Sequence, residues 1–222
     1  MNAPTRCALV AALLSLTTAS AFGQALAVKA GTDGAGVELE YGFGSVFGAR
    51  LQVNGGTFSH HLTKTSVYYD GHLRFRNAMA LADWHPGGGS WRVSAGLVYN
   101  DNKVDLNALP TGGTFTINGN TYPAASVGSY KGTLSFDKVA PYLGTGWGIS
   151  PRGAGLFGSV DLGVQYQPNH VSLTAVCGAP IQGTPACTQL ATDVAAEQVY
   201  LQEQTRVLRF WPVLQAGIGW RF

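Results

Sequence analysis

The chain has 222 residues, and its 14 Lys and Arg nearly balance its 12 Asp and Glu, which leaves a formal net charge of +2. Charged residues make up 12% of the sequence, against about 25% in typical soluble domains, whereas the 30 Gly residues are roughly twice the usual share. The composition therefore gives no support to nucleic-acid binding, and it is unlike the surface of a soluble domain.

Residues 1–23 have the three parts of a secretory signal peptide. Arg6 carries the one positive charge, residues 7–16 are almost all apolar, and small residues follow at Ala19, Ala21 and Gly23. The apolar stretch is shorter than the roughly 20 residues that a membrane-spanning helix needs. We therefore expect export of the chain, with a mature domain of residues 24–222.

Along the mature domain, apolar and polar residues alternate with a period of two, which is typical of strands with one apolar face. Turn signals such as Asp33-Gly34 and Pro86-Gly87 separate the alternating segments. One segment changes phase near Ala140-Pro141, which predicts a bulge there. The predicted strands cover residues 25–32, 37–41, 49–58, 67–84, 91–102, 130–147 and 156–166.

The last part of the chain holds a predicted helix and an eighth strand. Residues 188–205 have the pattern of a short, moderately amphipathic helix. In residues 208–222 every even position is apolar, and the stripe ends on Trp220 and Phe222. This stripe resembles the C-terminal strand of outer-membrane barrel proteins, in which such residues are read by the barrel-assembly machinery. Trp220 and Phe222 are therefore expected to act as an assembly signal.

The segments combine into one predicted fold. No apolar run in the mature domain is long enough for a membrane-spanning helix, and in lipid only helices and closed barrels satisfy their backbone groups. We predict an all-β protein, an antiparallel transmembrane β-barrel of about eight strands with a short helix before the last strand. Three long polar loops, at residues 59–66, 103–129 and 168–206, would face the cell exterior, because such barrels have short periplasmic turns.

The alternating strands, the segment at residues 140–147 and the Phe222 end together resemble the small outer-membrane barrels of the OmpA, OmpX and OmpW type. The likeness covers nearly the whole mature chain and is architectural. It implies a location in the cell outer membrane, with outer-membrane lipid, lipopolysaccharide and the barrel-assembly machinery as partners.

Alternation also assigns each strand charge to a face. A charge that faces lipid at mid-depth costs roughly 2–4 kcal/mol, so charges opposite the apolar stripe should point into the lumen. Among them we predict a charge network of Glu38, Glu40, Arg50, Asp70, Arg74 and Arg92. It would be either a packed, ion-paired core or a gate. The full inward set is Lys29, Glu38, Glu40, Arg50, Asp70, His72, Arg74, Arg76, Arg92, Lys131, Asp137, Asp161 and Arg209.

The two mature cysteines, Cys177 and Cys187, lie in a stretch rich in Pro and Gly. In an oxidising compartment this spacing favours a loop disulfide. The spacing does not match a zinc site, so we expect neither a metal nor another cofactor.

The leading functional hypothesis is a non-enzymatic outer-membrane barrel with a structural or surface-interaction role and a minor conductance at most. One alternative is a narrow, OmpW-like channel for small solutes. A further alternative is an enzyme that modifies lipid A, in which Ser59, the adjacent His60 and His61, Ser66 and Asp101 near the external rim supply nucleophile, base and carboxylate. No lipid A acyl-chain signature accompanies these residues, so no catalytic residue is assigned.

Overall fold

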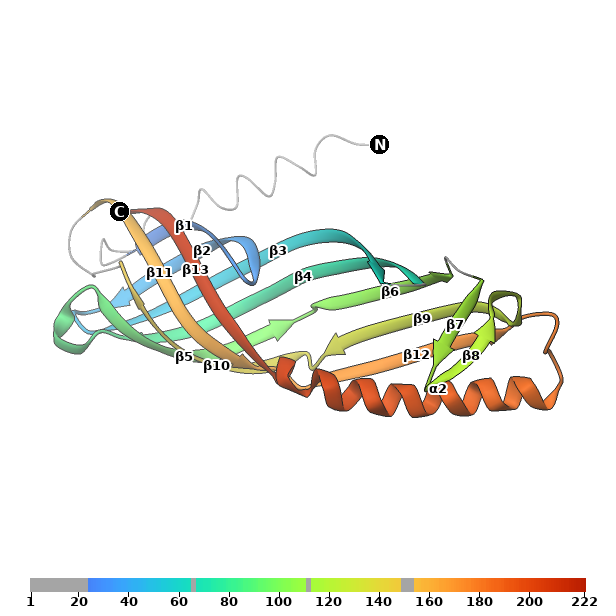
Figure 1. The fold of residues 1–222 in the computed structure, drawn as a ribbon. Helices are drawn as coiled ribbons and strands as arrows, with labels where there is room; N and C mark the ends of the chain where they lie inside the picture. The colour runs from blue at the N-terminus through green and yellow to red at the C-terminus, as the bar shows by residue number, and fades with distance from the viewer. Residues whose placement is uncertain (1–23, 65–66, 111–112, 149–153) are drawn as a thin grey trace, which may run out of the picture.

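The computed structural model describes residues 24–64, 67–110, 113–148 and 154–222, and the side chains of all of these except 58–64, 67–72 and 108–110. The predicted signal peptide, residues 1–23, lies outside the described residues. Eight antiparallel strands close into a barrel, which is prolonged at one end by a sheet and a long helix (Figure 1). The predicted eight-stranded barrel is confirmed.

The order around the barrel is β4-β3-β2-β1-β13-β11-β10-β5, and pairing of β4 with β5 closes it. Closure also joins the two ends of the described chain, since Ala25 of β1 lies opposite Arg221 of β13. The strands are β1 (Gln24–Gly31), β2 (Gly34–Phe43), β3 (Phe47–Lys64), β4 (Val67–Trp84), β5 (Trp91–Asn100), β10 (Val139–Trp147), β11 (Gly155–Tyr166) and β13 (Phe210–Arg221).

The two ends of the barrel differ. At one end the connections include the short turns at residues 44–46 and 85–90, and we call this the turn end. At the other end, the loop end, β3 and β4 continue beyond the barrel and pair with each other as far as Lys64 and Val67. There β4 leaves β5 and pairs with β6 (Lys103–Pro110), which is followed by β9 (Val127–Phe136) and β12 (Asn169–Cys177). We call this five-stranded extension, β3-β4-β6-β9-β12, the outer sheet.

The structure of the outer sheet differs from several expectations drawn from the sequence. The predicted loop at residues 59–66 holds the end of β3, as far as Lys64, and the predicted loop at residues 168–206 holds β12. The predicted polar loop at residues 103–129 contains β6, the hairpin of β7 (Thr114–Ile117) and β8 (Asn120–Pro123), the short 3₁₀ turn η2 (Ala124–Ser126) and the start of β9. The predicted bulge at Ala140-Pro141 is wrong, because Pro141 lies within β10 opposite Leu97. The change of phase occurs three residues earlier, at Asp137-Lys138, where the outer-sheet strand β9 ends and the barrel strand β10 begins.

The predicted helix at 188–205 is present as α2 (Pro185–Gln204), continued by the 3₁₀ turn η3 (Thr205–Arg209). It begins three residues earlier than predicted, at a proline, which suits the first turn of a helix because its missing N–H needs no partner there. None of the described helices is long and apolar enough to cross a membrane.

Helix α2 covers the free edge of β12. The N–H groups of Val171 and Leu173 donate to the Oε1 atoms of Gln202 (2.8 Å) and Gln198 (3.0 Å). Gln202 returns a hydrogen bond from Nε2 to the carbonyl of Asn169, at 2.8 Å. Glutamines spaced by four residues therefore satisfy backbone groups that would otherwise offer this edge to another strand.

Asp193, a residue of α2, joins the helix to the β7–β8 hairpin. Its carboxylate accepts hydrogen bonds from Tyr122, Asn120 (2.9 Å), Asn118 and Gln189 (3.2 Å each). The Tyr122 hydroxyl and these amides hold the pKa of Asp193 below its usual value. Apolar residues such as Phe115, Ile117 and Leu190 pack beside this contact. The outer sheet thus has a small core of its own, separate from the barrel.

Candidate functional site in the barrel lumen

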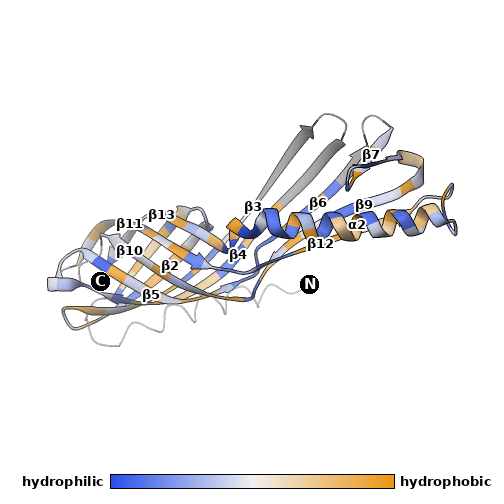
Figure 2. Cartoon of the chain, turned by 60° about the horizontal axis from the view of Figure 1, so that its bottom comes forward, coloured by the Kyte–Doolittle hydropathy of each residue, from blue (hydrophilic) through white to orange (hydrophobic). Residues whose placement is uncertain are grey.

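The outer wall of the barrel is apolar. Large hydrophobic side chains point away from the lumen, among them Leu51 and Val53, which are 62% and 55% exposed. Figure 2 shows hydrophobic residues interspersed with hydrophilic ones along the barrel strands, as a two-residue period requires. Exposed aromatic residues mark both limits of the apolar wall: Phe43, Phe47, Trp84, Trp91, Trp147 and Trp220 at the turn end, and Tyr99, Tyr166 and Phe210 at the loop end. Aromatic girdles around an apolar band are typical of membrane barrels.

Arg50 lies at the centre of a buried charge cluster in the lumen. Its side chain is 1% exposed. Nε and Nη2 donate to the two carboxylate oxygens of Asp83 at 2.5 and 3.0 Å, and Nη1 donates to Glu38 at 2.9 Å. Nη2 also reaches the hydroxyl of Ser94 at 2.9 Å. Contacts from β2, β4 and β5 therefore converge on one guanidinium from β3.

Asp161 of β11 is the second centre of the cluster. It accepts hydrogen bonds from Lys29 (2.5 Å), Arg92 (2.5 Å) and Arg50 (3.2 Å). Lys29 in turn donates to Glu38 at 2.8 Å, which closes a loop of ion pairs through both centres. We call the set of Lys29, Glu38, Glu40, Arg50, Asp83, Arg92 and Asp161 the lumen cluster. It holds three basic and four acidic side chains, all buried.

Glycines on the two remaining strands make room for this cluster. A Cβ atom at Gly146 of β10 would lie 2.5 Å from Oδ1 of Asp161, and one at Gly217 of β13 would lie 2.6 Å from Cγ of Lys29. Six strands therefore supply charges, while the other two supply the space that the charges fill. The lumen is closed by side chains at this level, as expected for eight strands.

Towards the loop end the lumen holds side-chain amides, a carboxylate and an apolar cluster that includes Met79 and Tyr142. Asp33, in the β1–β2 turn, is buried there and accepts hydrogen bonds from Trp211 Nε1 (3.1 Å) and Gln165 Nε2 (3.5 Å). Further amides bond to one another across strands, as in the pairs Gln52–Gln215 (2.8 Å) and Asn100–Gln167 (2.5 Å). The lumen thus changes from a cluster of charges near the turn end to amides, apolar side chains and the carboxylate of Asp33 near the loop end.

The structure brings together three of the six residues predicted to form the network, Glu38, Arg50 and Arg92, and buries Glu40 beside them. The predicted inward position of Arg74 is wrong, because Arg74 is exposed on the outer face of β4. The inward residues of β4 are the odd-numbered ones, such as Phe75 and Met79, so the even-numbered Arg74 points the other way. The side chain of Asp70 lies outside the described residues.

Other members of the predicted inward set divide between the lumen and the outer sheet. Lys29 and Asp161 belong to the lumen cluster. Arg76 and Lys131 are exposed, and Asp137 lies beyond the barrel, where β9 ends. Sequence reasoning missed Asp83, an odd-numbered residue of β4, because the phase assigned to that strand was reversed.

The remaining candidates are the predicted assembly signal and the residues considered for a lipid A-modifying enzyme. Trp220 and Phe222 point outward from the end of β13, and their reading by an assembly machinery stays a prediction. The side chains of Ser59, His60, His61 and Ser66 lie outside the described residues, and Asp101 forms an ion pair with Lys138. Among the described residues, no three His, Cys, Asp or Glu side chains lie together in a way that could hold a metal.

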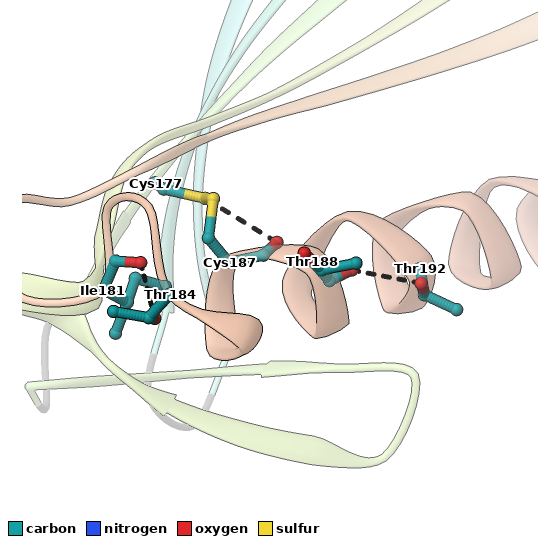
Figure 3. Close-up of a disulfide and its surroundings, with 6 residues drawn as sticks. All are labelled: Cys177, Ile181, Thr184, Cys187, Thr188 and Thr192. Atoms are coloured by element: carbon teal, nitrogen blue, oxygen red, sulfur yellow. Dashed lines mark hydrogen bonds between the residues drawn. A yellow bond between two sulfur atoms is a disulfide. The ribbon is translucent and has the colours of Figure 1, made fainter.

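The predicted disulfide is confirmed. Cys177, the last residue of β12, bonds to Cys187 in the first turn of α2, with the Cα atoms 5.8 Å apart (Figure 3). The bond therefore fastens the start of the helix to the end of the strand whose edge the helix covers.

We expect that replacing both cysteines with serine loosens the outer sheet and leaves the barrel intact. Closing a loop of this length is worth about 3 kcal/mol in the chain-entropy account. The expected result is faster hydrogen exchange in β12 and α2, with an unchanged urea midpoint of the barrel. An equal loss of protection in β1 and β13 would contradict this local role.

A closed eight-stranded antiparallel barrel with an apolar outer wall, aromatic girdles and a charged interior defines a small β-barrel of the outer-membrane type. The chain is similar to the crystal structure of Acinetobacter baumannii CarO, with a TM-score of 0.52 and 21% identity over 90% of this chain and 98% of that one. It is also similar to Acinetobacter baumannii CarO2, with a TM-score of 0.56 and 19% identity over 91% and 100% of the two chains.

At these identities the likeness concerns the fold. No protein-family model and no curated protein matches the sequence. Membership of the OmpA, OmpX or OmpW type stays a prediction.

Proposed function

We propose that the protein is an integral, non-enzymatic barrel of the bacterial outer membrane whose role is structural or is exerted through the outer sheet. The apolar wall between two aromatic girdles supports the membrane location, since such a surface matches the hydrocarbon layer. The short turns would face the periplasm and the outer sheet the exterior.

The filled lumen is the observation that carries the proposal. Arg50, Arg92 and Lys29 are each no more than 1% exposed, and acidic partners hold all three. A solute would have to separate these ion pairs, and breaking a buried pair costs about 3–5 kcal/mol. The barrel is therefore better suited to anchoring the outer sheet than to conducting.

The outer sheet also offers an edge for interaction. On the side away from β4, β3 pairs with β2 only as far as Gly55, so residues 56–64 pair with no described strand on that side. This stretch of nine residues spans about 30 Å. The opposite edge, on β12, is covered by α2. One open and one covered edge favour partner binding by strand addition at β3.

Two measurements test the proposal. Fractionation of a Gram-negative cell should recover the folded, heat-modifiable protein with the outer membrane, and its recovery with the inner membrane or the soluble fraction would contradict the location. In planar bilayers, the folded protein should give no stable conductance steps beyond those of the same preparation after heat denaturation. Regular, ion-selective steps would instead favour the narrow channel.

That channel is the second candidate, and the amide-lined part of the lumen favours it. Such amides can form hydrogen bonds with small polar solutes, and a solute would then have to displace the side chains of the lumen cluster. Liposome swelling in small neutral solutes would detect such a path. The lipid A-modifying enzyme is the third candidate, and mass analysis of lipid A with and without the gene tests it.

The expected partners follow from this location. Outer-membrane lipid would surround the apolar wall, and the barrel-assembly machinery would act on β13 with its outward Trp220 and Phe222. Lipopolysaccharide would meet the barrel at its loop end.

A further inference from the structure

Arg74 and Arg76 are neighbours on one face of β4, just beyond the loop-end limit of the apolar wall. Both are exposed and both point outward from β4, two residues apart on the same face. The next residue on that face, towards the turn end, is Ala78. Ala78 lies opposite Tyr99 of β5, and Tyr99 lies opposite Val139 of β10. Tyr99 and Val139 are 58% and 57% exposed and belong to the loop-end limit of the apolar wall. Two residues along a strand span about 7 Å, so Arg76 is one step beyond the hydrocarbon-facing surface.

The two arginines belong to a polar row that crosses the outer sheet. Arg74 lies opposite Lys103 of β6, Lys103 opposite Ser135 of β9, and Ser135 opposite His170 of β12. Residues that lie opposite each other on neighbouring strands share a face. The outer face of the sheet is therefore polar at the level where the apolar wall ends, which is the level of lipid headgroups in a membrane barrel.

Other polar groups in and beside this row already have partners within the protein. Lys138 pairs with Asp101 and Lys103 with Asp105 at 2.9 Å, and the ring of His170 hydrogen-bonds to Asp137 at 2.7 Å. The guanidinium charges of Arg74 and Arg76 also help to hold the pKa of Asp101 below its usual value, after the larger effect of Lys138, so both arginines lie close to this group. Yet neither arginine forms an ion pair with a carboxylate among the described residues.

We propose that Arg74 and Arg76 bind a phosphate of lipid A, the phosphorylated lipid of the external leaflet, at the rim of the barrel. This inference rests on the proposed outer-membrane function and names a partner for it. Arginine is suited to the task because its planar fork matches phosphate oxygens and forms charge-assisted, bidentate hydrogen bonds. On the membrane side of the two arginines, the apolar wall would accept the acyl chains.

The experiment measures lipid A retained by the folded, disulfide-bonded protein, by native mass spectrometry from detergent. It compares the wild type with the double variant Arg74→Gln, Arg76→Gln, and with Lys131→Gln as a matched control. Lys131 is exposed on the same face of the outer sheet, four residues beyond Ser135 and therefore about 13 Å farther from the membrane. The probes are bisphosphorylated lipid A, the same lipid without phosphates, and excess inorganic phosphate as a competitor.

We expect the double variant to retain bisphosphorylated lipid A roughly tenfold less than the wild type, since charge-assisted bonds to phosphate are lost. Lys131→Gln should retain it like the wild type, the dephosphorylated lipid should bind weakly, and inorganic phosphate should displace little. Equal retention by the double variant, or of the dephosphorylated lipid, would overturn the inference.

Two other results would also overturn it. An equal loss in Lys131→Gln would indicate unspecific charge attraction, and displacement by inorganic phosphate would indicate a site for free anions. Outer-membrane fractionation of the same variants separates the two proposals, because the protein can reside in that membrane without holding lipid A at this site.

Discussion

Arg50→Ala is expected to lower the free energy of unfolding of the barrel by about 3–5 kcal/mol, because it leaves Glu38, Asp83 and Asp161 buried without the guanidinium that they share. Urea titration of the folded protein in detergent measures the loss. Removing one partner of a buried pair costs more than the pair itself contributes, since the remaining charges stay away from water.

The matched control is Arg206→Ala, which removes the same charge from an exposed ion pair. Arg206 is 58% exposed and lies 2.9 Å from Glu203. Such pairs are worth about 0–1 kcal/mol, so the urea midpoint should hardly move. Equal midpoints for the two variants would show that Arg50 is solvated and that the lumen cluster is not buried.

Gly163→Val should destabilise the barrel by about 1–3 kcal/mol through overpacking. Gly163 faces the lumen, and a Cβ atom there would lie 2.6 Å from the ring carbons Cε2 and Cζ of Tyr142. Tyr142 is itself buried in the barrel interior, so its ring cannot swing into solvent to make room. The urea midpoint and the heat-modifiable fraction both report the effect.

Gly158→Val supplies the control on the same strand. Gly158 faces outward, and its nearest atom to an added Cβ is the carbonyl oxygen of Gly217 at 3.9 Å. A β-branched residue suits a lipid-facing strand position, so this variant should be neutral or slightly stabilising. If Gly158→Val proves the more damaging of the two, the assigned faces of β11 are exchanged.

The barrel strands could be predicted because lipid makes one face of each strand apolar. Apolar and polar residues then alternate clearly along a strand, as in β13, where Leu214, Ile218 and Trp220 all face outward. The same alternation correctly placed Lys29, Glu38, Arg50, Arg92 and Asp161 in the lumen.

The phase of β4 could not be obtained in this way. The half of β4 nearer the loop end belongs to the outer sheet. There an outward charge such as Arg74 meets water or headgroups, so its exposure costs little free energy. Reading the whole strand from these charges reversed the assignment, which removed Asp83 from the predicted cluster and added Arg74. Beyond the hydrocarbon layer, the position of a charge does not indicate which face of a strand points into the lumen.

Most of the outer sheet could not be predicted from the sequence, because its strands pair with partners that are distant along the chain. Strand β6 does alternate, with Val104 and Leu106 between Lys103, Asp105 and Asn107, but turn-forming residues surround it and its partners lie far along the chain. Pairing of β6 with β9 and of β9 with β12 depends on contacts that a local pattern does not contain. The disulfide was accessible to prediction because it depends on short spacing and an oxidising compartment.

The most direct test of the account is a scan of four neighbouring positions on β3 with spin labels, in protein reconstituted into lipid. Leu51 and Val53 face outward, whereas Gln52 and Asn54 are buried in the lumen. Labels placed one at a time at these positions should show high collision rates with membrane-dissolved oxygen at 51 and 53 and low rates at 52 and 54. The opposite phase, or equal rates at all four positions, would contradict the claim that an apolar wall faces lipid and the charged cluster fills the lumen.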